Sequence, residues 1–351
     1  MKRLRLLILY IVIVVGIFSL GLWLNDMKQD QADRRVISTR AEITVYTDRD
    51  LEVMTALGQV YEREAQVRVH VIPIPPNQMA TRLALPEAEQ QGDLVISTKT
   101  NLEEGVEHGA FRRLPVTLTH MVDTVFHGLD EQWVGIWYDP YVLALHDTFY
   151  GSQGKYVNTW FSLAYTGPWR IAVTDFVADA SSITLLNTFG AIYGPEGAIS
   201  YFDSLRPRIV QYAKALPSSV RMAAIGDVQV SVGHYSDAKL YEAHKYPLTI
   251  LYPREGTPYD MMGVGILKGS SNVGESEAFV SWLLSERVQS VLKEADMYYL
   301  PTIETVESQK DRQGNHLVLW NAGIVKEEQD KILQEWIRQV RFRKDTPCVS
   351  C

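Results

Sequence analysis

The sequence predicts an α/β protein whose folded part is built as two lobes. From Glu42 onward, short β-rich runs alternate with amphipathic helical stretches, which is typical of mostly parallel sheets flanked by helices. The alternation occurs twice, once on either side of the apolar runs 133–138 and 142–146. A length of 351 residues is also enough for two cores of ordinary size.

The first unit is expected to be a βαβαβ arrangement with helices on both faces. Its expected elements are strands 43–46, 67–74 and 93–96, and helices 51–65, 78–90 and a third capped by Asn101 that ends in the turn 105–109. Pro75 and Pro76 separate the second strand from the second helix. Because open α/β sheets bind ligands at the carboxyl ends of their strands, residues 47–49 and 97–99 are candidate ligand contacts.

The second unit follows the runs 133–138 and 142–146. Its expected elements are strands 169–173, 228–232 and 263–267, a connecting run 248–252, and helices 181–193, 198–205, a short one near 218, 275–295 and 327–343. Extended segments near 141–145 and 248–262 are expected to cross between the lobes. Two lobes joined in this way can close around a ligand by bending a few residues at the crossings.

Composition narrows the class of protein. Hydrophobic residues make up 46% of the chain and charged residues 22%, which indicates a globular rather than a disordered or fibrous protein. The net charge of −8 argues against a nucleic-acid partner, because phosphate-reading surfaces need clustered Lys and Arg. Cys348 and Cys351 are the only cysteines, so the tail 346–351 is expected to hold a local disulfide or to be dispensable.

The N-terminus predicts a membrane segment. Residues 6–24 are uncharged and largely apolar, close to the roughly 20 residues that span a bilayer core, and they follow Lys2, Arg3 and Arg5. We expect an uncleaved single-pass anchor with the body outside the cytoplasm; a cleaved signal and a periplasmic protein is the alternative. The expected organisation is anchor or signal 1–25, tether 26–41, lobe 1 42–140, lobe 2 141–252, second part of lobe 1 with C-terminal helices 253–345, and tail 346–351.

Several ordered fragments resemble one family. They are Val45-Tyr-Thr47, Gly92-Asp-Leu-Val95, 167–172, 251–259, 263–269, 278–285 and Leu300-Pro301. Together they resemble the extracytoplasmic solute-binding proteins of bacterial ABC importers, in the group that holds binding proteins for ferric ion, phosphorylated sugars, thiamine, phosphonates and polyamines. The resemblance covers roughly 43–302. It implies the two-lobed periplasmic-binding-protein type 2 fold, capture of a small solute by hinge closure, and an ABC permease as partner.

Helix starts in the second lobe are candidate anion sites. Ser181, Ser182 and Thr184 begin one predicted helix, and Ser218 and Ser219 begin another. Backbone N–H groups and hydroxyls at a helix N-terminus suit phosphate or carboxylate, although each serine could instead be an ordinary cap. The resemblance implies that ligands contact the first of these helix starts, and it places Ser219 near the cleft. We therefore expect a small anionic solute.

The first lobe offers further polar candidates. Thr47, Asp48 and Arg49 follow the first strand, and Ser97 and Thr98 follow the third. Arg49 could clamp an acidic ligand with two parallel hydrogen bonds, or it could be a solvated charge.

His234 and Tyr235 are the most informative pair. The resemblance implies two adjacent tyrosines at this place in ferric-ion binders, whereas this chain has one tyrosine beside a histidine. Tyr235, His234 and Asp237 could still form an iron site, which keeps a ferric-ion binding protein as an alternative. The favoured role is hydrogen bonding to, or stacking on, a small organic anion, with Tyr259 as a further wall.

Enzyme motifs are lacking. The chain contains no G-x-S-x-G, H-E-x-x-H or G-x-x-x-x-G-K-[ST] pattern, so we expect neither catalysis nor a cofactor. A second alternative keeps the same ectodomain but makes it a ligand sensor that partners a histidine kinase. The sequence does not identify the ligand.

Overall fold

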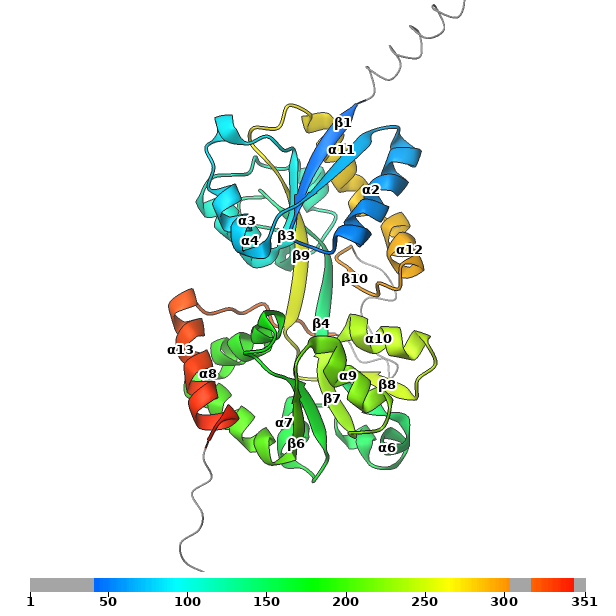
Figure 1. The fold of residues 1–351 in the computed structure, drawn as a ribbon, viewed down its shortest axis with the longest axis vertical. Helices are drawn as coiled ribbons and strands as arrows, with labels where there is room; N and C mark the ends of the chain where they lie inside the picture. The colour runs from blue at the N-terminus through cyan, green and yellow to red at the C-terminus, as the bar shows by residue number, and fades with distance from the viewer. Residues whose placement is uncertain (1–40, 304–316, 344–351) are drawn as a thin grey trace, which may run out of the picture.

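The computed structural model describes residues 41–303 and 317–343. Two α/β lobes lie one above the other, joined by two long strands (Figure 1). These strands are β4 (Val134–His146) and β9 (Tyr259–Ile266), which pair antiparallel. The strand order through the molecule is β2-β1-β3-β9-β4-β7-β5-β6, with β8 (Leu248–Leu251) and β10 (Leu300–Pro301) also paired to β4.

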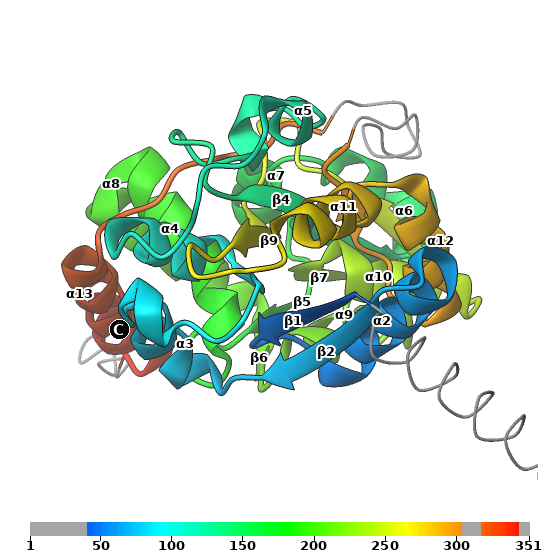
Figure 2. The ribbon, with the colours of Figure 1, turned by 90° about the horizontal axis from the view of Figure 1, so that it is seen from above.

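Lobe 1 contains the first unit and the strand that returns to it. β1 (Glu42–Thr47) pairs in parallel with β2 (Arg68–Pro73) and β3 (Leu94–Thr98), while β9 runs antiparallel beside β3. Helices α3 (Pro76–Leu83) and α4 (Lys99–Glu107) lie on one side of these strands, and α2 (Leu51–Ala65) and α12 (Glu286–Glu294) lie on the other (Figure 2). Their apolar faces form one core, because the fully buried side chains of Ile43, Leu94 and Leu57 belong to a single cluster.

Lobe 2 has its own core. β7 (Val230–His234), β5 (Ile171–Thr174) and β6 (Ile209–Ala213) are parallel, and β4 runs antiparallel to β7. Its helices are α6 (Asp147–Ser152), α7 (Trp160–Tyr165), α8 (Ile183–Leu205), α9 (Leu216–Ala224), α10 (Tyr235–Ala243) and α13 (Lys326–Trp336). Trp336 of α13 is fully buried in this core, 4.8 Å from Phe176 by ring centroids, so α13 packs on lobe 2.

The fold confirms the predicted α/β class and the two lobes. Helix 51–65 is found with the predicted bounds, and the first three predicted strands are found within a few residues. The helix expected over 78–90 is wrong in its second half: α3 ends at Leu83, and Pro86 precedes a separate 3-10 turn, Glu87–Glu89. Pro86 fixes its own backbone and disfavours a helical residue before it, which explains the early end.

Other elements are joined, divided or new. The two apolar runs 133–138 and 142–146 lie in one strand, β4. The predicted helices 181–193 and 198–205 both lie within α8. Gly194, with a φ of 76°, makes a kink between the two helical segments. The single helix expected over 275–295 is divided into α11 (Val273–Leu283) and α12. β6 and α10 were not predicted.

The membrane segment and the cysteine tail lie outside the described residues. Within 41–303 and 317–343, no helix combines the length and the apolar character that crossing a bilayer requires. The expected anchor at 6–24, the tether and the tail with Cys348 and Cys351 therefore stay predictions.

Candidate functional site

The hinge strands bring strand ends and helix starts of both lobes together. At the crossing, Asp139 of β4 pairs with Asp260 of β9. Two residues farther along β9, Met262 pairs with Thr98 at the carboxyl end of β3 in lobe 1. Two residues farther along β4, Tyr141 pairs with His234 at the carboxyl end of β7 in lobe 2. Seen from above, β5 and β6 appear close to β1 and β2, and β4 and β9 lie to one side of them (Figure 2). The ends of the strands thus border the space between the lobes, as open α/β sheets predict.

In lobe 1, Asp48 is the centre of a hydrogen-bond network. Its buried carboxylate accepts hydrogen bonds of 2.9 Å from the Ser97 hydroxyl, the Asn101 amide and Arg49 Nε. Thr47 is fully buried, and its hydroxyl accepts the Arg49 N–H at 3.1 Å. The structure brings these predicted residues together, but Arg49 is already paired within the chain.

The cap of α4 differs from the prediction. Thr98 is the N-cap, and its hydroxyl oxygen accepts the backbone N–H of Asn101 at 3.4 Å. Asn101 therefore lies inside the helix, and its amide points to Asp48 and Ser97. Thr98 is thus explained by capping, and a role for it in ligand binding stays a prediction.

In lobe 2, one carboxylate occupies both predicted anion sites. Asp179 Oδ1 accepts the N–H of Ser181 at 3.0 Å, and Asp179 Oδ2 accepts the N–H of Leu216 at 3.1 Å. Ser181 precedes α8 and Leu216 begins α9, so a single side chain supplies an anion to the starts of two helices. One N–H at each of these two helix starts is therefore engaged by the protein itself.

The serines of these helix starts are also engaged. The Ser182 hydroxyl donates to the carbonyl of Asp179 at 2.6 Å. The buried Ser219 hydroxyl donates to the carbonyls of Leu216 and Val232 at 2.9 and 3.1 Å. Ser181 and Ser218 are exposed, so of the five predicted hydroxyl residues these two are the most open to solvent.

His234 lies between the two hinge carboxylates. Its Nε2 is 3.0 Å from Asp260 Oδ2 and its Nδ1 is 3.6 Å from Asp139 Oδ2. Burial alone would lower the pKa of His234, but the two carboxylates outweigh burial and raise it to about 9, so the imidazole is charged at neutral pH. The ring also packs edge-on against Tyr141 at 4.5 Å.

Two helix starts are tied to the same carboxylates. The Thr184 hydroxyl donates to Asp260 at 2.6 Å, and both the N–H and the hydroxyl of Ser236 donate to Asp139. Thr184 is in the first turn of α8 and Ser236 in the first turn of α10. His234, Thr184 and Ser236 all belong to lobe 2, so the hinge carboxylates are fastened to that lobe.

Asp237 differs from these carboxylates. It is half-buried in the first turn of α10, and within the described residues it makes no hydrogen bond or ion pair. Burial raises its pKa to about 7; His234 opposes this rise, and Asp139 and Asp179 add to it. The charged groups that act on Asp237 are therefore one cation, His234, and two carboxylates.

The two predicted aromatic walls differ in how deeply they are buried. Tyr259 packs in the core of lobe 1, with its ring 6.0 Å from Tyr138 and 6.1 Å from Phe126. Tyr235 is half-buried at the start of α10, with its ring 6.1 Å from that of Tyr252. Tyr259 therefore belongs to the core of lobe 1, whereas Tyr235 directly follows His234 and packs against buried clusters of both lobes.

The structure offers little support for a metal centre in lobe 2. In the described part of the chain, no group of three or more His, Cys, Asp and Glu side chains is arranged to hold a metal ion. Of the set His234, Tyr235 and Asp237, His234 directs both ring nitrogens toward carboxylates of its own chain.

Sequence reasoning missed the residues that organise this site. These are Asp139, Asp179, Asp260, Ser236 and Asn101. Two of them carried a usable signal: Asp139 precedes Pro140 between two β-rich runs, and Asp260 lies in the returning segment that was expected to cross. A polar residue in an otherwise apolar crossing segment indicates a site rather than a core.

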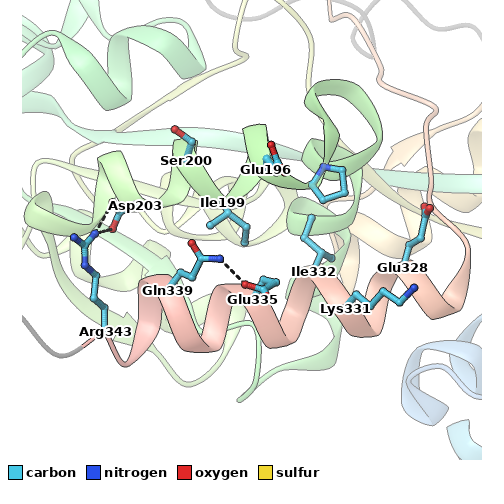
Figure 3. A pocket seen from close by; sticks show the side chains of 11 residues that line it. Glu196, Ile199, Ser200, Asp203, Glu328, Lys331, Ile332, Glu335, Gln339 and Arg343 are labelled. Atoms are coloured by element: carbon cyan, nitrogen blue, oxygen red, sulfur yellow. Dashed lines mark hydrogen bonds and ion pairs between the residues drawn. The ribbon is translucent and has the colours of Figure 1, made fainter.

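A separate groove lies between α8 and α13, on the flank of lobe 2 (Figure 3). It has a volume of about 510 Å³, with Ile199 and Ile332 among its apolar residues and an Arg343–Asp203 ion pair of 2.9 Å at one end. None of the residues predicted to bind a ligand lines it. The groove is therefore distinct from the site between the lobes.

Two α/β lobes, joined by paired strands that carry polar residues at the crossing, define the class of two-lobed binding proteins. Comparison with known families agrees: the model for bacterial extracellular solute-binding proteins matches residues 43–297, and the chain belongs to this family. The resemblance found in the sequence is confirmed.

Solved structures show the same fold. AfuA of Actinobacillus pleuropneumoniae, solved with fructose-6-phosphate, is 20% identical with a TM-score of 0.64 and covers 87% of this chain and 100% of its own. The ferric binding protein of Campylobacter jejuni is 18% identical with a TM-score of 0.66, covering 84% and 98%. IdiA (FutA) of Trichodesmium, in complex with iron and citrate, is 14% identical with a TM-score of 0.69, covering 85% and 99%.

A sequence relative is found in Haemophilus influenzae. This protein, described as uncharacterized, is 29% identical over 181 residues, which are 50% of this chain and 52% of the relative. The match thus spans about half the length of that relative.

Proposed function

We propose that the chain captures a small polar solute between its lobes and delivers it to the permease of an ABC importer. The observation that carries the proposal is the pair of hinge strands, which set Asp139 and Asp260 at the crossing between two separately packed lobes in a chain of the solute-binding family. Fructose-6-phosphate and iron are bound by similar structures, so both are candidate solutes. We also propose that 6–24 anchors the protein outside the cytoplasm.

Closure follows from how the lobes are packed. Each lobe has its own buried cluster, and the paired strands β4 and β9 link the two: β9 pairs with β3 of lobe 1, and β4 pairs with β7 and β8 of lobe 2. Rigid lobes joined by extended strands move by bending a few hinge residues. A solute that contacts both lobes binds the closed form better, and this difference in affinity shifts the population toward closure.

Spin-label distances on the full chain in detergent micelles test closure. Labels at I72C in β2 and V210C in β6 report the distance between the lobes, because both side chains are exposed and these strands lie at opposite edges of the sheet. The natural Cys348 and Cys351 are replaced by serine. A control pair, V210C and Y246C, lies within lobe 2.

We expect one of four probes, fructose-6-phosphate, ferric citrate, lysine or spermidine, to shorten the distance between the lobes and leave the control distance unchanged. Binding detected by a thermal shift without any shortening would contradict hinge closure, as would a failure of all four probes to bind.

A further inference from the structure

The two crossing strands pass from one lobe to the other within a single step of their ladder. On the lobe 1 side, Tyr138 of β4 pairs with Met261 of β9, and both side chains are buried in the lobe 1 core. The next pair, Asp139 with Asp260, is hydrogen-bonded to side chains of lobe 2. The boundary between the lobes therefore lies between these two neighbouring pairs, and we call this position the hinge step.

Lobe 1 holds its side of the hinge step through strand pairing. Tyr138 pairs with Leu300 of β10 as well as with Met261 of β9. One residue beyond Met261, Met262 pairs with Thr98 at the end of β3. Both crossing strands are thus paired to further strands of lobe 1 here, and neither can bend at this point without disturbing a ladder of hydrogen bonds.

Lobe 2 holds its side of the hinge step through three side chains. The N–H and the hydroxyl of Ser236 donate to Asp139, and the Thr184 hydroxyl donates to Asp260 at 2.6 Å. His234 lies between the two carboxylates, 3.0 Å from Asp260 and 3.6 Å from Asp139. We call Thr184, His234 and Ser236 the hinge clamp. Hydrogen bonds to a charged acceptor are among the stronger ones in proteins, so the hinge clamp ties both carboxylates firmly to lobe 2.

The backbone directly beyond the hinge step is stiff on the lobe 2 side. Pro140 fixes its own φ and also restricts Asp139, the residue before it. The N–H of Tyr141 donates to the carbonyl of Pro258 at 2.9 Å, and the carbonyl of Tyr141 accepts the Thr257 hydroxyl at 2.6 Å. The chain is therefore held on both sides of the hinge step, which leaves the step itself as the place where it can bend.

Contacts that cross the hinge step are of weaker kinds. The ring of Tyr259, on the lobe 2 side of the step, packs in the lobe 1 core, but its hydroxyl has no hydrogen-bond partner among the described residues. The ring of Tyr235 also packs against that core. Two contacts at the surface run between the lobes, Lys99 with Asn321 and His244 with Asp296. Ring contacts can slide and surface pairs contribute little, so these contacts resist bending less than the hinge clamp does.

We propose that closure bends the chain at the hinge step, and that the hinge clamp makes the two hinge carboxylates move as part of lobe 2. The proposal rests on the proposed function, since it locates the hinge of the same cleft. Thr184, His234 and Ser236 are positioning residues, because they act on closure through the carboxylates that they hold. The hinge clamp thereby limits the range of angles that the lobes sample before a solute binds.

Spin-label distances in the solute-free full chain, in detergent micelles and with the natural cysteines replaced by serine, test this inference. Labels at I72C and V210C report the distance between the lobes, and labels at V210C and Y246C report a distance within lobe 2. T184V removes the hydroxyl that holds Asp260 and keeps the size of the side chain. The matched control is T302V, which removes a buried 2.7 Å hydrogen bond to the Gly135 carbonyl of β4, on the lobe 1 side of the hinge step.

We expect T184V to broaden the distribution of distances between the lobes. Conformers outside the wild-type range should become about ten times as populated, which is the shift that loss of one hydrogen bond to a charged acceptor produces. S236A should act in the same direction but less strongly, because the N–H of Ser236 still donates to Asp139. T302V should keep the wild-type distribution, and the distance within lobe 2 should stay the same in all three variants.

Three results would overturn the proposal. The first is a wild-type distribution in both T184V and S236A, since the hinge clamp would then not restrain the lobes. The second is equal broadening in T302V, because the bend would then not be confined to the hinge step. The third is broadening of the distance within lobe 2 in T184V, because the lost hydrogen bond would then only support the structure of that lobe.

Failure of the inference and failure of the proposed function are distinguishable, because this test needs no solute. Broadening in T184V together with a failure of all four probes to close the lobes would support the hinge step and contradict solute capture. Closure by one probe, with unchanged distributions in T184V and S236A, would leave the transport function in place and refute the role of the hinge clamp.

Discussion

Replacing His234 with glutamine tests whether the imidazole holds the hinge carboxylates together. Glutamine keeps the approximate size and a polar end but cannot carry a positive charge. His234 is 7% exposed, and Asp139 and Asp260 would keep their buried positions without the cation between them. Removal of one partner from a buried charge cluster typically costs about 3–5 kcal/mol of unfolding free energy. We expect a loss of this size at neutral pH.

The pH dependence gives the magnitude of the same interaction. The pKa of His234 rises from 6.5 to about 9 in the folded protein, because two carboxylates outweigh the effect of burial. A rise of this size corresponds to at most about 3.5 kcal/mol, since each pKa unit is about 1.4 kcal/mol. The folded pKa lies above the unfolded value, so this stability is fully present below about pH 6.5 and is lost as the pH rises toward about 9.

Urea unfolding at about pH 6 and about pH 9.5 measures both effects in the full chain. Wild type should lose up to about 3 kcal/mol more than H234Q across this range, because the variant has no imidazole to titrate. H108Q is the control, since His108 is exposed at the end of α4 and should retain the wild-type slope. If H234Q and wild type show the same pH dependence, the assigned ion pairs do not stabilise the hinge.

Two further substitutions test the lobes separately. D48A should lower the unfolding free energy by about 2–3 kcal/mol, because three donors lose their acceptor. The control D130A, on an exposed turn, should change the unfolding free energy little. Equal urea midpoints for D48A and wild type would contradict the hydrogen-bond network of Asp48. W336A should lower the unfolding free energy by about 3–5 kcal/mol, because it leaves a cavity in the core of lobe 2. V325A, at an exposed position, is the control and should have little effect. A native-like melting temperature for W336A would show that α13 is not part of that core.

The fold was largely predictable because its signals are local. Alternating apolar runs and helical periods mark most elements, and helix 51–65 is found with its predicted bounds because Asp50 caps it and its apolar face is continuous. The errors arise where tertiary contacts decide. β4 continues through Pro140 because the hinge needs one extended crossing strand, and β6 at the sheet edge has mostly exposed or half-buried residues, which hide its alternation.

The site was only partly predictable, since strand ends can be located from sequence but their partners cannot. Asp48, Ser97 and His234 are at the predicted strand ends and lie in the site. The sequence does not show that Asp48 neutralises Arg49, or that Asp139 and Asp260 pair across the hinge from positions far apart in the chain. Which charges remain unpaired is a property of the folded contacts alone.

The starts of α8 and α9 show why the folded contacts must be known before a ligand charge is inferred from the sequence. Ser181 and Ser218 suggest free N–H groups, and free N–H groups at a helix start suggest an anion. One carboxylate, Asp179, weakens that argument, because it accepts one N–H at each of the two helix starts and brings a negative charge there. A helix N-terminus attracts an anion only while its donors lack an internal partner. In this chain one donor at each of the two helix starts has such a partner, so the starts of α8 and α9 offer fewer free N–H groups than their serines suggest.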